Sequence, residues 1–117
     1  MPRSPSSVPA AGLRFTRGAP AEFRSSAIVA RGFCSACGTP LYMREDGDPN
    51  YELAIGTLDD PNAVPAFSDQ AGVESKLRWF NGLRDLPEHR TEDDRSPQDL
   101  ARLKCLQHPD HDTEQWP

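Results

Sequence analysis

Cysteine is scarce in this sequence: its 117 residues include three, Cys34, Cys37 and Cys105. Three is an odd number, whereas the disulfide frameworks that stabilise small secreted domains pair their cysteines. The count therefore argues against such a framework. We expect a cytoplasmic protein whose thiols stay reduced unless they serve a catalytic or metal-binding role.

Long apolar runs and an excess of basic residues are also lacking. No stretch approaches the roughly eighteen apolar residues of a membrane-spanning helix, and the N-terminus has no signal-peptide pattern. Lys and Arg number 13 against 18 Asp and Glu, a net charge of −5. Neither a membrane nor a nucleic acid is therefore an expected partner.

Apolar residues make up 36% of the chain and prolines number 12, so we expect part of the chain to remain unpacked. Residues 1–11 are rich in Pro, Ser and Ala and are predicted to be a disordered lead-in. Residues 12–87 are predicted to form one domain. Residues 88–117, with eight acidic and four basic residues, are predicted to be a solvated tail with a helix near 97–108.

Apolar residues that alternate with polar ones predict short strands between turns in the central part of the chain. The expected extended segments are 13–17, 22–33, 40–44 and 51–58, with a turn at 45–50. In the tail, Ser96 has the side chain of a helix N-cap, and Pro97 suits the first helical position. Residues 73–80 fit a strand or a short helix equally well.

The densest chemical signal is the stretch RGFCSACGTPLYMR at residues 31–44. Its C-x-x-C pair allows three interpretations: a redox pair, two small buried side chains, or half of a zinc site. A redox pair of the thioredoxin type begins a helix, but Pro40 and a strand-like pattern follow here. In a zinc knuckle the backbone visits positive φ just after the second cysteine, and Gly38 permits this. We therefore favour Cys34 and Cys37 as zinc ligands.

These residues also carry a family resemblance. The run RGFCSACGTPL, preceded by PAEFRSS and followed by IGTLDDP and by Lys76, Trp79, Leu86 and Pro87, resembles the glutathione-dependent formaldehyde-activating enzymes and the centromere protein V-like proteins. The resemblance spans roughly residues 8–88. It implies a small all-β zinc fold of short antiparallel sheets, of the β-tent kind. It also implies a carbon–sulfur lyase activity that joins formaldehyde and glutathione, with glutathione or its adducts as partners.

The chain departs from the family pattern in its metal ligands. Family members carry a C-x-C motif and a C-x-C-x-x-C cluster before this region, but no cysteine precedes Cys34. By resemblance, Cys34 and Cys37 are structural zinc ligands, the catalytic ligands have no counterpart, and an N-terminal part of the fold is missing. A region where the family commonly has a histidine reads PAFSDQAG, residues 65–72.

Two sources remain for the other half of the zinc site. A partner chain or an independently encoded segment could supply it, and a homo-oligomer of this chain is also an open possibility. Alternatively, Cys105 and His108 have a spacing that zinc accepts, although we favour the simpler explanation that Cys105 lies on an apolar helix face and that the charge of His108 suits a helix end. The sequence therefore predicts a zinc-binding member of this lyase family without its catalytic zinc site. The alternative is an active lyase in which a further segment or a partner supplies the missing cysteines.

The remaining candidate residues have simpler explanations. Asp59 and Asp60 could be paired carboxylates for acid–base chemistry, but a turn after a strand explains them without any chemistry. Trp79 and Phe80 are expected in a core. His89 and His111 lie in polar segments and are expected to be solvated.

Overall fold

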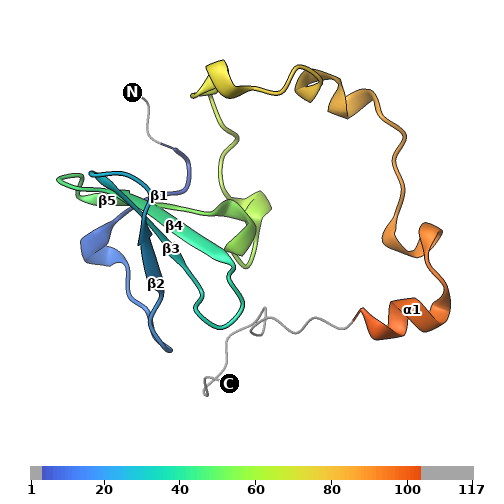
Figure 1. The fold of residues 1–117 in the computed structure, drawn as a ribbon, viewed down its shortest axis with the longest axis horizontal. Coiled ribbons are helices and arrows are strands. Elements are labelled where there is room, and N and C mark those ends of the chain that lie inside the picture. The colour runs from blue at the N-terminus through green and yellow to red at the C-terminus, as the bar shows by residue number, and fades with distance from the viewer. Residues whose placement is uncertain (1–3, 104–117) are drawn as a thin grey trace. The chain divides into compact units, whose positions relative to one another are not determined.

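The computed structural model describes residues 4–103 and divides the chain into two compact units (Figure 1). The first unit extends to Asp69, and the second begins at Gln70. The boundary lies inside the segment 12–87 that the sequence predicts as one domain. The two units are described separately below.

A five-stranded antiparallel sheet forms the first unit, and its strand order is β1-β5-β4-β3-β2. The strands are β1 (Ser7–Pro9), β2 (Ala21–Arg24), β3 (Val29–Phe33), β4 (Pro40–Glu45) and β5 (Asn50–Leu53). Strands β2 to β5 follow one another as a meander, and β1 pairs with the outer side of β5. The expected antiparallel all-β class is confirmed.

The turns between these strands have identifiable chemical causes. Gly47 has φ of +84° in the turn between β4 and β5, a conformation that a residue with a Cβ rarely adopts. In the same turn the Asp48 side chain accepts a hydrogen bond from the amide of Asn50 at 2.8 Å. Between β2 and β3 the Ser26 hydroxyl accepts from the amide of Val29 at 3.1 Å. These local bonds fix the register of both hairpins.

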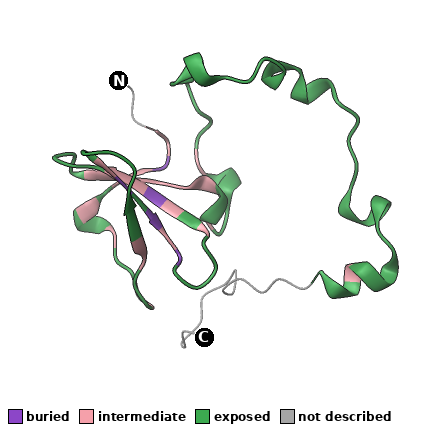
Figure 2. Ribbon diagram, viewed as in Figure 1, coloured by how far each residue is buried: buried purple, intermediate pink, exposed green. Residues whose placement is uncertain are grey.

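The buried residues of the sheet lie on two of its inner strands, β3 and β4 (Figure 2). Tyr42 of β4 is 7% exposed and Ala30 of β3 is fully buried. The Tyr42 ring centroid lies 4.8 Å from that of Tyr51 and 5.9 Å from that of Phe15. Gly32 is the register partner of Tyr42, and a Cβ at Gly32 would lie 2.2 Å from the Tyr42 ring. Only glycine therefore lets the ring lie flat across β3.

Several expected extended segments differ in the structure. Residues 13–17 form no strand, and the strand that pairs with β5 is β1, from the segment expected to be a disordered lead-in. The segment 51–58 is a strand only to Leu53, and the 3₁₀ turn η2 (Ile55–Thr57) follows it. The lead-in expected at 1–11 contains β1 and the first two residues of the 3₁₀ turn η1 (Ala10–Gly12), so its described residues are ordered here.

The described part of the second unit consists of short helical turns joined by extended segments. They are η4 (Val73–Ser75), η5 (Phe80–Asp85), η6 (Thr91–Asp94) and α1 (Pro97–Arg102), whereas η3 (Pro61–Ala63) belongs to the first unit. The expectation of Trp79 and Phe80 as core residues is wrong here, since they are 61% and 47% exposed. An apolar pattern identifies side chains that favour burial but not the surface that would cover them.

The predicted start of the C-terminal helix is confirmed. Ser96 accepts a hydrogen bond from the amide of Asp99 at 3.1 Å, and Pro97 occupies the first turn. The helix α1 ends at Arg102, with Leu103 as its C-cap, so it is shorter among the described residues than the expected 97–108. Residues 104–108 lie outside the described residues. None of the helices between residues 4 and 103 is long and apolar enough to cross a membrane.

Candidate metal site

The loop between β3 and β4 holds the two cysteines of the C-x-x-C motif. Its ends are joined by the amide of Cys34, which donates to the carbonyl of Thr39 at 2.9 Å. Inside this closure the amide of Gly38 donates to the carbonyl of Cys34 at 2.7 Å. Gly38 has φ of +75°, as the knuckle interpretation requires. The chain therefore turns back directly after the second cysteine.

The two thiols occupy different environments on this loop. Cys34, at the end of β3, is 7% exposed, whereas Cys37, near the tip, is exposed. The Cys37 Sγ lies 3.1 Å from the Thr39 Oγ1. One thiol is thus held by the sheet and the other faces outward from a turn closed by backbone hydrogen bonds.

Thiolates are a donor type that zinc prefers, and two of them would be half of the ligands of a tetrahedral site. Within residues 4–103 no group of three or more His, Cys, Asp and Glu side chains is placed to hold a metal ion. Cys105 and His108, the candidates for completing the site, lie outside the described residues, as does His111. The described residues therefore fit the zinc interpretation as a half-site.

A second group of polar side chains lies across the buried face of the sheet, and sequence patterns did not reveal it. Glu22 of β2 accepts a hydrogen bond from the Tyr42 hydroxyl at 2.8 Å. The Arg44 guanidinium binds both oxygens of Glu22, with its Nε at 2.7 Å and an Nη at 2.9 Å. Arg44 also pairs with Asp46 at 3.2 Å, and Asp46 pairs with Arg24. This charge network joins β2 to β4 across the intervening strand β3.

The protonation states of the network suit a structural role. Hydrogen bonds from Arg44 and then from Tyr42 lower the pKa of Glu22 to about 2. Burial, followed by the hydrogen bond to Glu22, raises the pKa of Tyr42 well above its usual value. A hydrogen bond from Arg24 lowers the pKa of Asp46. At neutral pH Glu22 is thus ionised and Tyr42 protonated, so neither is suited to general acid–base catalysis.

The structure also settles two minor candidates. The Asp60 side chain accepts a hydrogen bond from the amide of Asn62 at 3.1 Å and so begins η3. The turn interpretation is confirmed for Asp60. The His89 side chain is 62% exposed, as expected for a solvated residue, and its Nδ1 lies 4.0 Å from an Asp94 oxygen.

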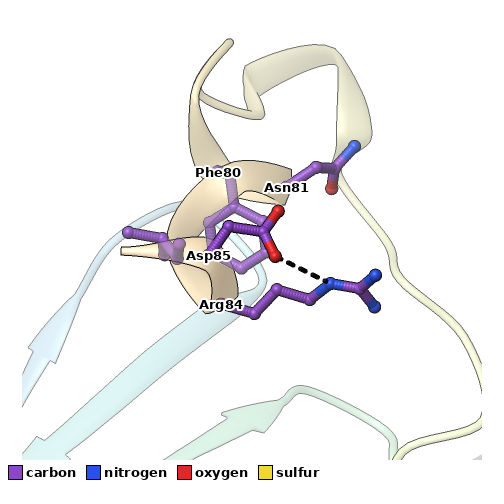
Figure 3. Close-up of a pocket in the computed structure, with 5 residues that line it drawn as sticks. Phe80, Asn81, Arg84 and Asp85 are labelled. Atoms are coloured by element: carbon purple, nitrogen blue, oxygen red, sulfur yellow. Dashed lines mark ion pairs between the residues drawn. The ribbon is translucent and has the colours of Figure 1, made fainter. Parts of the chain in front are cut away.

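A shallow hollow of about 560 Å³ lies beside η5 in the second unit (Figure 3). Its lining consists of Phe80, Asn81, Leu83, Arg84 and Asp85, all from this one element. Arg84 and Asp85 form an ion pair of 3.7 Å that is largely exposed to water. The hollow lies between neighbouring side chains of a single short helix and contains no residue of the C-x-x-C loop.

Comparison with known proteins supports a family assignment. The sequence model described as glutathione-dependent formaldehyde-activating enzyme matches residues 1–71, which is more than half of the chain. The chain belongs to the glutathione-dependent formaldehyde-activating enzyme family. Neither the curated proteins nor the solved structures give a match.

The extent of the match is informative. It ends at residue 71, close to the boundary of the first unit at Asp69. The family region of this chain therefore contains the five-stranded sheet and the C-x-x-C loop. Lys76, Trp79, Leu86 and Pro87, which contribute to the resemblance seen in the sequence, lie beyond the matched region. Membership in the formaldehyde-activating family connects the chain with carbon–sulfur lyase chemistry on glutathione and formaldehyde.

Proposed function

We propose that this chain is a zinc-binding member of the formaldehyde-activating enzyme family in which Cys34 and Cys37 are structural ligands. The closed β3–β4 loop carries the proposal. Its cross-loop hydrogen bond from Cys34 to Thr39 and the positive φ of Gly38 place two thiols on one short turn. A structural zinc ion would link this turn to further ligands and contribute directly to the stability of the fold.

The proposed zinc site has a simple stoichiometric test. We expect purified protein to contain at most one zinc ion per chain. Cys34→Ser and Cys37→Ser should each lose most of this zinc, because each removes one of the two thiolate donors of the C-x-x-C loop. Zinc would be measured by inductively coupled plasma mass spectrometry after gel filtration. Since Cys34 is buried, Cys37→Ser tests the ligand role at an exposed position.

The matched control is Ser35→Ala, a change on the same loop that removes no thiol and should leave the zinc content unchanged. Equal zinc in the wild type and in both cysteine variants would contradict the proposal. Cys105→Ser and His108→Ala, measured in parallel, would show whether these two residues complete the site.

The family match favours a second candidate function, an active lyase. In the family reaction the glutathione sulfur adds to the carbonyl carbon of formaldehyde, and the thiol proton ends on the new hydroxyl oxygen. A catalytic zinc site needs about three protein ligands and one open position. The chain has three cysteines in total, and two belong to the proposed structural site. We therefore propose that this chain lacks the catalytic zinc site and that a further segment or a partner would have to supply it.

This difference predicts the outcome of an activity assay. The zinc-loaded 117-residue chain should not accelerate the condensation of formaldehyde with glutathione above its spontaneous rate. Exchange NMR spectroscopy of the equilibrium mixture, with and without protein, measures that rate. An acceleration that disappears in Cys37→Ser would establish the lyase function and would show that the C-x-x-C site is catalytic.

A further inference from the structure

Strand β2 forms one end of the sheet in the part of the chain that the structure describes. Glu22, Phe23 and Arg24 are all exposed, and Phe23 is 65% exposed (Figure 2). An edge strand carries backbone N–H and C=O groups that can pair with a further strand. Charged residues on an edge usually discourage such pairing, so the order of the charges on β2 decides which strand it accepts.

The hydrogen bonds to β3 show which backbone groups of β2 face outward. The amide of Ser25 donates to the carbonyl of Val29 at 3.0 Å, toward β3. Backbone groups alternate in direction along an antiparallel strand. Phe23 therefore also faces β3 with its N–H and C=O, as its register partner Arg31 indicates. The N–H and C=O groups of Glu22 and Arg24 consequently point to the open edge.

These directions limit how β2 could pair with a second copy of itself. In an antiparallel pair, residues directly opposite each other must both face inward or both face outward. Twofold pairing within the strand can thus be centred on any of its four residues. A centre on Ala21 places Glu22 opposite Pro20, which has no backbone N–H to donate. A centre on Glu22 or on Arg24 places like charges directly opposite, which destabilises a pair. A centre on Phe23 instead places Glu22 of each copy opposite Arg24 of the other.

We propose that β2 is a homodimer interface in which two copies pair antiparallel about a twofold axis at Phe23. In this register the outward backbone groups of Glu22 and Arg24 form two hydrogen-bonded pairs. The two Phe23 side chains form a directly opposed aromatic pair on the other face of the strand. The proposal does not involve the C-x-x-C site and so goes beyond the proposed zinc function.

The charge network of each copy is compatible with this pairing. Glu22 already binds Arg44, and Arg24 already binds Asp46, so both side chains lie on the same face of the sheet. The side chain of Arg24 is 47% exposed, which leaves part of its guanidinium accessible. In the dimer, acidic and basic side chains alternate across the interface. Asp46 and Arg24 of one copy are followed by Glu22 and Arg44 of the second copy.

The test measures self-association of the full chain by sedimentation. One four-residue strand buries less than the roughly 1,200 Å² of a standard interface, so we expect a weak dimer that needs protein concentrations up to about 1 mM. Phe23→Glu replaces the aromatic pair by two opposed carboxylates and should weaken the dimer at least about tenfold. The introduced carboxylate would lie opposite Arg31 within its own sheet, so the fold should be retained.

The matched control is Phe67→Glu, which makes the same chemical change at a residue that is 62% exposed and lies outside the sheet. It should dimerise like the wild type. A wild type that stays monomeric throughout, or Phe23→Glu that dimerises as well as the wild type, would overturn the proposal. A dimer that dissociates with a zinc chelator but ignores Phe23→Glu would also overturn it and would place the interface at the metal site.

The register has its own test. In the proposed dimer two residues at position 23 face each other as a non-hydrogen-bonded pair, with Cα atoms about 4.5 Å apart, within disulfide range. Phe23→Cys should therefore form an interchain disulfide on mild oxidation, identified by mass spectrometry of the linked peptides. Ala21→Cys should not, because the two positions 21 are displaced along the strands by about 13 Å. A disulfide through position 21 instead would refute the register.

Discussion

Gly32→Ala is expected to destabilise the first unit by about 3 kcal/mol, a large effect for the addition of one methyl group. The Cβ would lie 2.2 Å from the Cε1 and Cζ atoms of Tyr42, a distance at which the ring must move. The Tyr42 ring is only 7% exposed and lies near the Tyr51 and Phe15 rings, so it has little room to move aside. Urea unfolding followed by circular dichroism measures the loss.

Two controls isolate the cause of this loss. Gly56→Ala adds the same methyl group where no heavy atom lies within 4 Å, and it should change the free energy of unfolding by less than about 1 kcal/mol. In a Tyr42→Ala background the methyl group at position 32 no longer meets a ring, so Gly32→Ala should cost little there. An equal cost of Gly32→Ala in both backgrounds would contradict the ring contact as its origin.

Tyr42→Ala itself is expected to cost about 3–5 kcal/mol, the range for removing a large buried aromatic side chain. The change removes the ring from its neighbours Tyr51 and Phe15 and uncovers the backbone at Gly32. It also removes the hydroxyl that donates to Glu22 at 2.8 Å. Denaturant unfolding and near-ultraviolet circular dichroism would report the loss of stability and of aromatic packing.

Tyr42→Phe separates the two contributions. It keeps the ring and removes only the hydroxyl, so it should cost about 1 kcal/mol, because Glu22 remains bound to Arg44 and partly exposed. If Tyr42→Phe were as destabilising as Tyr42→Ala, the hydrogen bond rather than the packed ring would dominate. The assignment of Tyr42 as a packed core residue would then be wrong.

The features that the sequence predicts well depend on neighbours in the chain. The positive φ of Gly38, the turn at Gly47, the strand β4 and the helix start at Ser96 all have local signals. A glycine that follows C-x-x-C or a serine before a proline constrains the backbone within a few residues. For this reason the closed shape of the candidate metal loop could be predicted.

The features that the sequence does not predict depend on register. Glu22 contacts Tyr42 and Arg44 because β2 and β4 flank β3 and because Gly32 lies between them without a side chain. No sequence pattern gives that alignment before the sheet order is known. Similarly, the alternation at residues 13–17 suits a strand, but alternation alone does not show whether a segment joins the sheet. Phe15 instead contributes its ring to the neighbourhood of Tyr42.

The position of β1 in the sheet has a kinetic consequence. Ser7 pairs with Glu52, and the amide of Leu53 donates to the carbonyl of Ser6 at 3.1 Å, so among the described strands the first in sequence joins the last. Strands β2 to β5 close through short hairpins, which form within microseconds, whereas β1 must close a loop that includes all of them. During synthesis β1 therefore remains unpaired until β5 has emerged from the ribosome. Docking of β1 onto β5 is the expected last step in the assembly of this sheet.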